Sequence, residues 1–247
     1  MNSVIKGELS TALNLSVKAV KRILKDHNEL FDDRIKMQNS TFLSTCFIEF
    51  NLNSPKLKNK NFRKALNYGI NKSIITKIAF GETKGKIGNV GITHPSIINY
   101  RTGKINGYNY NLDSAKAYLS KANLNEIPNL EIEIGENDFK AQGIAEELQI
   151  QLEQHLGIQL KINIVPEKYK LEKTKYARSE LAISYIISEY ESPEGFLNIF
   201  YGEGVTENLD IPSYPNTTRF KNKSFDKMMD RGRRSENYEN ANRSFVS

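Results

Sequence analysis

The side chains in this sequence that are able to do chemistry form no recognisable catalytic group. The chain has three histidines and one cysteine in 247 residues. His27, His94 and His155 stand far apart and match no HExxH or similar zinc pattern, so we expect no metal site. Cys46 lies inside an apolar run, which is more typical of a buried small side chain than of a nucleophile. The sequence therefore predicts no catalytic residue, no metal and no cofactor, and the protein is not expected to be an enzyme.

The charged residues indicate neither a nucleotide site nor a nucleic-acid surface. The segment 81–86, GETKGK, has its glycines too close together for a P-loop and follows a helical pattern where a P-loop follows a strand. Thirty-five Lys and Arg against 29 Asp and Glu give a net charge of +6, which we expect to be spread along the chain. Arg231, Arg233 and Arg234 stand among acids and are typical of a solvated helix end. We therefore expect no nucleic-acid partner.

Composition predicts a folded core and no membrane span. The chain is 38% hydrophobic, which provides enough apolar side chains for a buried core. It contains no apolar run of about 18 residues, the length that would suggest a transmembrane helix. The first ten residues, MNSVIKGELS, lack the basic flank and apolar centre of a signal peptide.

Hydrophobic periodicity predicts an α/β fold built from βαβ units. Residues 130–134 and 158–164 alternate apolar and polar side chains as strands do. Between them, apolar residues recur at helical spacing up to a stop at Gly157. A helix of this length between two strands indicates a crossover that joins parallel strands. Residues 181–187 are predicted to be a third strand of the same sheet.

The first half of the chain adds a strand, several helices and a long loop. Residues 41–52 are apolar on both sides, so we expect a strand inside the sheet and not at its rim. Residues 85–110 are rich in Gly, Asn and Pro and are expected to form an ordered loop. The predicted helices are 16–26, one that opens at Asn61, one that runs from a cap at Asn71 to a stop at Gly81, and one that opens at Asn111.

The position of one acidic residue suggests a ligand site. In open α/β sheets, ligands bind at the carboxyl ends of the strands. The third predicted strand is followed by the segment 188–197, SEYESPEGFL, in which Pro193 forces a turn. Position alone therefore singles out Glu189, although an ordinary solvated loop acid is the alternative.

Six segments of the chain, in the same order as in the family, resemble the oligopeptide-binding proteins of ABC transporters, solute-binding protein family 5. The segment 62–75, FRKALNYGINKSII, is similar to the family helix that begins with an RxAL motif. SEYESPEGFL resembles the family motif ADYxxPxxFL. The resemblance covers nearly the whole chain, through the segments 6–24, 50–81, 110–122, 156–165, 188–197 and 214–230.

The resemblance implies a periplasmic-binding-protein-like fold of type II, in which two α/β lobes close over an extended oligopeptide. Such a protein delivers its ligand to ABC permease subunits in the membrane. The resemblance also implies that residues 1–48 are a remnant of the first lobe and the hinge, and that 49–247 form the second ligand-binding lobe without its return to the first. The complete protein is then expected to be a monomer that is periplasmic or anchored at the cell surface, with its export signal upstream of Met1.

The resemblance also assigns expected ligand-binding residues. In the family, the acid of the ADYxxP motif holds the terminal ammonium of the peptide, and this acid falls on Glu189. Glu in place of Asp keeps the charge but adds one methylene. The family commonly has Trp three residues before the acid, where this chain has Ile186, so an aromatic wall has to come from Tyr185 or Tyr190. Together with Ser188, these three residues form the predicted ligand-binding set.

Two alternatives remain open at this level. The family also takes up nickel chelates, haem, opines and oligosaccharides, and the missing Trp and the exchanged acid are compatible with such solutes. A lobe of this kind also occurs as the solute-sensing part of a cytoplasmic regulator with an attached DNA-binding domain.

Overall fold

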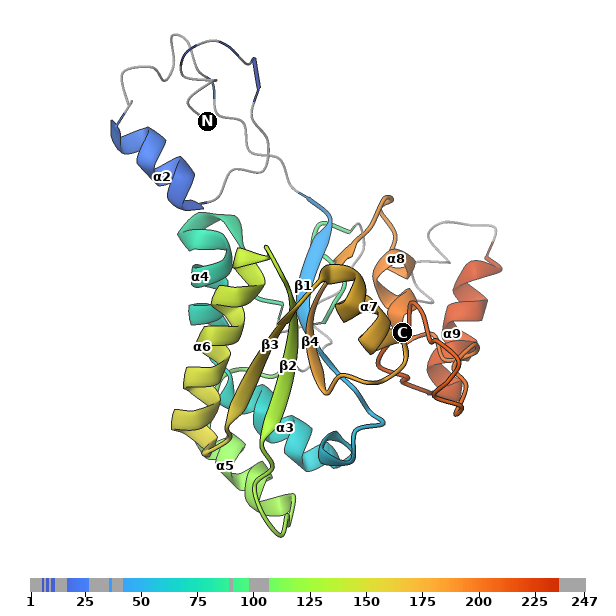
Figure 1. Ribbon diagram of the computed structural model, residues 1–247. Coiled ribbons are helices and arrows are strands. Elements are labelled where there is room, and N and C mark those ends of the chain that lie inside the picture. Colours follow the sequence, from blue (N-terminus) through green and yellow to red (C-terminus); the bar gives the residue numbers. More distant parts are fainter. Residues whose placement is uncertain are drawn as a thin grey trace.

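The computed structural model describes residues 6, 8, 10–11, 17–26, 36, 42–88, 91–97 and 107–235. Within them, a four-stranded sheet is covered by helices (Figure 1). The elements in chain order are α2 (Val17–Asp26), β1 (Ser44–Phe50), η2 (Pro55–Leu57), α3 (Lys60–Gly69), α4 (Lys72–Lys84), α5 (Leu112–Lys121), β2 (Leu130–Gly135), α6 (Phe139–Leu156), β3 (Leu160–Val165), α7 (Glu167–Lys175), β4 (Leu181–Ile187), α8 (Glu194–Leu197), η4 (Asn198–Phe200) and α9 (Lys223–Arg233).

The sheet confirms the predicted βαβ unit. Its strand order is β1-β4-β2-β3. β2 is parallel to β3, with α6 between them in sequence, and it is also parallel to β4. β1 runs antiparallel to β4, with Ser44 opposite Ile187 and Phe50 opposite Leu181. Three parallel strands therefore end at the same edge of the sheet.

The prediction that residues 41–52 form an inner strand is wrong for the described part of the chain. β1 covers Ser44–Phe50 and lies at one end of the strand order. Its two apolar sides have a different cause, because both faces of the sheet are covered at this point. Cys46 and Ile48 pack against the main core, whereas Phe47 packs against a second apolar cluster. Coverage of both faces, and not an inner position, explains the pattern.

Asparagine and aspartate side chains begin most of the helices, as the sequence suggests. Asn71 Oδ1 accepts a hydrogen bond from the Ser73 N–H, and Asn111 Oδ1 accepts one from the Ser114 N–H. The helix expected to open at Asn61 starts one residue earlier, because Asn59 is its cap. These side chains satisfy N–H groups that have no partner within the helix.

Two glycines end helical segments at the expected places. Gly81 has φ 75° and ψ −176°, so it interrupts the helix that begins at Lys72. Gly157 has φ 68° in the left-handed region, and its N–H donates to the Glu153 carbonyl at 3.0 Å. A residue with a Cβ adopts this conformation only at a cost, which explains glycine here.

The main apolar core lies between the sheet and the helices α3, α5 and α6. The inner residues of all three parallel strands contribute to it, as does one long stripe of α6. Burial of these side chains is the main favourable contribution to folding. The buried residues of the α6 stripe are Ala141, Ile144, Ala145, Leu148, Leu152 and Leu156.

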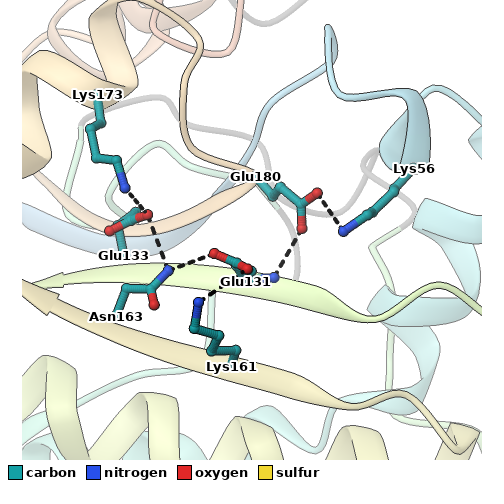
Figure 2. Close-up of polar contacts among 7 residues, drawn as sticks. All are labelled: Lys56, Glu131, Glu133, Lys161, Asn163, Lys173 and Glu180. Carbon is teal, nitrogen blue, oxygen red and sulfur yellow. Dashed lines mark hydrogen bonds and ion pairs between the residues drawn. The ribbon is translucent and has the colours of Figure 1, made fainter.

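On β2 and β3, the opposite face of the sheet is polar. Figure 2 shows Glu133 of β2 between Lys173 of α7 and Asn163 of β3. Glu133 is only 2% exposed, and its Oε1 lies 2.6 Å from Lys173 Nζ and 3.3 Å from Asn163 Nδ2. The same Asn163 group donates to Glu131 at 2.8 Å, and this hydrogen bond lowers the pKa of Glu131. The acidic positions of β2 are thus paired with groups from β3 and α7.

Candidate functional site

The carboxyl ends of β2, β3 and β4 meet at one edge of the sheet, here called the carboxyl edge. Gly135 and Val165 pair in register at the ends of β2 and β3, and β4 runs in the same direction and extends further, to Ile187. β1 begins at the same edge, because Ser44 lies opposite Ile187. Ligands of α/β sheets bind outside such an edge, so the loops that leave it are the candidate site.

The turn after β4 is fixed by its own first residue. Ser188 is 8% exposed, and its N–H donates to the Leu43 carbonyl at 2.9 Å. Its hydroxyl donates to the Tyr190 carbonyl at 2.6 Å. Gly195 passes so close that a Cβ at this position would overlap Ser188 Oγ. The serine therefore shapes the turn, and its role as a ligand contact stays a prediction.

Glu189 and Tyr190 lie on the outside of this turn. Glu189 is exposed and has no hydrogen bond or ion pair with any residue that the structure describes. Tyr190 is 53% exposed. Burial of its ring and the nearby Glu194 raise the pKa of Tyr190, so its hydroxyl is protonated at neutral pH. The turn thus presents a free carboxylate beside an aromatic ring, which is suited to a cationic group.

Tyr185 lies near the same edge, two residues before the end of β4, on the α6 side of the sheet. It pairs in register with Cys46 of β1. Burial raises the pKa of Tyr185 far above its usual range, and neighbouring Cys46 and Asp138 raise it further. Burial also raises the pKa of Cys46 to about 11. Both groups are therefore neutral at physiological pH, and little of Cys46 is present as thiolate.

Sequence reasoning did not find three further residues of the carboxyl edge. Asp138 caps α6 by accepting the Ala141 N–H at 2.9 Å, and it faces Tyr185. Lys140 Nζ lies 4.6 Å from the centre of the Phe80 ring and 6.0 Å from that of Tyr185. Asp138 and Lys140 directly follow β2, so the rule that sites lie after parallel strands would have indicated them. Phe80 lies in α4 and does not follow a parallel strand, so this rule does not indicate it.

A second apolar cluster supports the turn from the face opposite α6. Ile97, Ile186 and Phe196 are buried together. The segment 91–97 crosses this cluster, and Thr45 Oγ1 of β1 donates to the Ile92 carbonyl at 2.9 Å. The turn after β4 is therefore packed against β1 and a neighbouring loop, which fixes the position of Glu189.

The described residues contain no candidate metal site and no candidate membrane span, and one pocket lies away from the carboxyl edge. No three His, Cys, Asp or Glu side chains there are grouped so that they could hold a metal ion. No described helix is long and apolar enough to cross a membrane. A pocket of about 280 Å³ lies at the amino ends of β2 and β3, far from the carboxyl edge, and is lined by Lys56, Asn129, Leu130, Glu131, Gln159, Leu160 and Lys161.

The mixed sheet, its βαβ units and the edge that they form define an α/β lobe of the type II periplasmic-binding-protein kind, as predicted. The model of the bacterial extracellular solute-binding proteins, family 5 (middle region), matches residues 1–208. The chain therefore belongs to this family. No curated protein sequence matches it.

Solved structures of similar fold include three that are described as peptide-binding or periplasmic binding proteins. DppA from Helicobacter pylori, in complex with the peptide STSA, has a TM-score of 0.78 at 20% identity, with 99% of this chain and 45% of that chain covered. AppA from Clostridium difficile, a putative peptide binding protein, has a TM-score of 0.76 at 20% identity, with 99% of this chain and 47% of that chain covered. AppA from Bacillus subtilis, in complex with a nonapeptide, has a TM-score of 0.73 at 17% identity, with 93% of this chain and 49% of that chain covered. At these identities the likeness shows the fold, and this chain spans about half the length of each.

Proposed function

We propose that this chain binds oligopeptides as the substrate-binding component of an ABC importer. The ligand lies along the carboxyl edge of the sheet, and Glu189 holds its terminal ammonium. The single observation that carries this proposal is the exposed, unpaired carboxylate of Glu189 at the edge where ligands of such sheets bind.

The chemistry of the edge suits an ammonium group. A charged amine that leaves water needs an anionic partner, because an unpaired buried charge costs several kcal/mol. Glu189 is the free acid of the turn, and Tyr190 and Tyr185 supply rings close to it in sequence. The solved neighbours described in complex with peptides add support for a peptide as the ligand.

The proposal extends to the ligand-binding lobe, its location and its partners. We propose that the sheet and its helices form the ligand-binding lobe expected for 49–247, and that the chain acts outside the cytoplasmic membrane with permease subunits as partners. β1 pairs with β4 along its whole length, so we place the start of this lobe at Ser44 and not at residue 49. The family description as extracellular solute-binding proteins supports the location.

Peptide titration of the full-length protein tests the role of Glu189. The Glu189→Gln variant removes the charge but keeps the size of the side chain. A charge-assisted hydrogen bond contributes about 1.5–3 kcal/mol, so we expect affinity for a free peptide to fall roughly ten- to a hundredfold. Affinity for the N-acetylated peptide, already low, is expected to change little.

Glu191→Gln is the matched control, because it makes the same change two residues along the same turn. Equal affinity of wild type and Glu189→Gln for the free peptide would sink the assignment of Glu189. Tight binding of a solute without an ammonium group, equal in both proteins, would favour the non-peptide members of the family.

A further inference from the structure

One pair of helices, α3 and α5, carries a clear excess of positive charge. α3 and α5 together hold five basic residues and one acid, a net charge of +4 against +6 for the whole chain. α2, with four basic residues and one acid, and α9, with four basic residues and two acids, also carry a positive excess, so the charge is spread over several helices. The fold brings α3 and α5 together although they are far apart in sequence.

Four lysines, one of them just before α3, lie where the first half of α3 meets the end of α5. The Asn59 and Asn61 amides donate to the carbonyls of Ala122 and Lys121, at 2.8 and 3.1 Å. In Figure 1 the two helices lie at the lower end of the sheet, next to the start of β2. We call the lysines at this junction the lysine patch, which consists of Lys58, Lys60, Lys64 and Lys121.

Two ammonium groups of this patch share one aromatic ring, which attracts each of them. Lys64 Nζ and Lys121 Nζ both lie over the ring of Tyr118, at 4.8 and 5.3 Å from its centre. Lys60 lies in the first turn of α3, at the positive end of the helix dipole, and that turn contains no acid. Like charges placed in this way reduce stability, which is a common mark of a functional surface.

No acid of the described residues neutralises the lysine patch. None of its four members forms an ion pair with another described residue. The acids at the starts of β2 and β4 are already engaged, because Glu131 pairs with Lys161 at 3.3 Å and Glu180 with Lys56 at 2.8 Å (Figure 2). The positive charge is therefore available to an external anion.

The kind of basic residue indicates the kind of anion. Arg forks recognise single carboxylates and phosphates with fixed geometry, whereas Lys acts as a mobile point charge. The one arginine here, Arg63, is half-buried and already donates to the Leu57 and Lys58 carbonyls at 2.6 and 2.8 Å. The patch thus consists of flexible ammonium groups around an amphipathic tyrosine, a composition suited to the headgroup region of a bilayer.

We propose that the lysine patch binds the anionic headgroups of a phospholipid bilayer. The patch lies at the amino end of the sheet, whereas the candidate ligand site lies at the carboxyl edge, so the lobe is able to contact lipid and ligand at once. This contact would keep the protein close to a membrane whatever solute it binds, and it does not depend on the identity of that solute.

Vesicle flotation tests the proposal directly. The probes are vesicles of equal parts phosphatidylglycerol and phosphatidylcholine, and vesicles of phosphatidylcholine alone, at low ionic strength. Each lysine near such a surface contributes about fivefold in binding. We expect the K60Q/K64Q/K121Q variant to bind the anionic vesicles on the order of a hundredfold more weakly than wild type. Salt at about 0.15 M should weaken wild-type binding, because the Debye length there is about 8 Å.

The matched control removes the same charge elsewhere. K168Q/K223Q/K227Q neutralises three exposed lysines on α7 and α9 that form no ion pair with a described residue. It should bind the anionic vesicles within a fewfold of wild type. Equal losses in both triple variants would overturn the proposal, since net charge alone would then act. Absence of wild-type binding to the anionic vesicles, or binding to soluble polyphosphate in its place, would also overturn it. Circular dichroism confirms that both variants are folded.

Discussion

The buried ion pair between Glu133 and Lys173 allows a sharp test of how the polar face of the sheet is held together. Lys173→Met removes the ammonium from Glu133 but keeps most of the side-chain volume. Glu133 would then keep only the Asn163 amide at 3.3 Å, and its Oε2 already has no partner among the described residues. The variant therefore leaves a buried carboxylate almost unpaired.

The expected loss of stability follows from burial. Breaking a buried pair by removing one partner costs about 3–5 kcal/mol. The Lys173 side chain is 24% exposed, so water partly screens the pair and we expect the lower limit, about 3 kcal/mol. For a chain of this size, each kcal/mol lowers Tm by roughly 2–4 °C. The melting temperature should therefore fall by roughly 6–12 °C.

Thermal and urea unfolding of a double-mutant cycle provide the assay. Removing both charges with Lys173→Met and Glu133→Gln should restore stability to within about 1 kcal/mol of wild type, because no unpaired charge remains. Lys175→Met breaks a more exposed pair with Glu172 at 3.4 Å and should cost less than about 1 kcal/mol. A double variant as unstable as Lys173→Met alone would refute the reasoning, since packing and not charge would then be the cause.

Two further predictions concern single residues. In the folded protein at pH 8, Cys46 should react with a disulfide reagent at least about a hundredfold more slowly than in denaturant, because burial raises its pKa from 9.0 to about 11 and leaves little thiolate; equal rates would contradict this. Gly157→Ala should lower the free energy of unfolding by about 1 kcal/mol, because φ of 68° is unfavourable with a Cβ, and Gly157→Asn should cost less; an unchanged urea midpoint for Gly157→Ala would count against the helix-end argument.

The sequence predicts the elements whose pattern is local. Alternation in 130–134 and 158–164, with helical spacing between them, is enough to define β2, α6 and β3, since each period reflects burial against one shared core. The position of β1 in the sheet is not local information. Its two apolar sides indicate that both faces are covered, but they do not tell which strands pair with it.

For the candidate site, too, the sequence predicts what depends on local pattern and not what depends on packing between distant elements. The place of Glu189 follows from the end of one strand, which sequence periodicity locates. The approach of Phe80 and Lys140 to Tyr185 depends on how α4 and α6 pack, and no pattern in either helix carries that information. The gathering of Lys64 and Lys121 on Tyr118 likewise results from the α3–α5 contact.

The tightly fastened turn after β4 has a consequence for the thermodynamics of association. Ser188 ties its start to Leu43 and to Tyr190, and Gly195 closes over it. Ordering the backbone of one mobile residue costs about 1–2 kcal/mol in conformational entropy. In this turn that loss occurs during folding, so a ligand that reaches Glu189 has only to restrict the rotamers of one side chain. The backbone of the turn is thus preorganised before any ligand arrives.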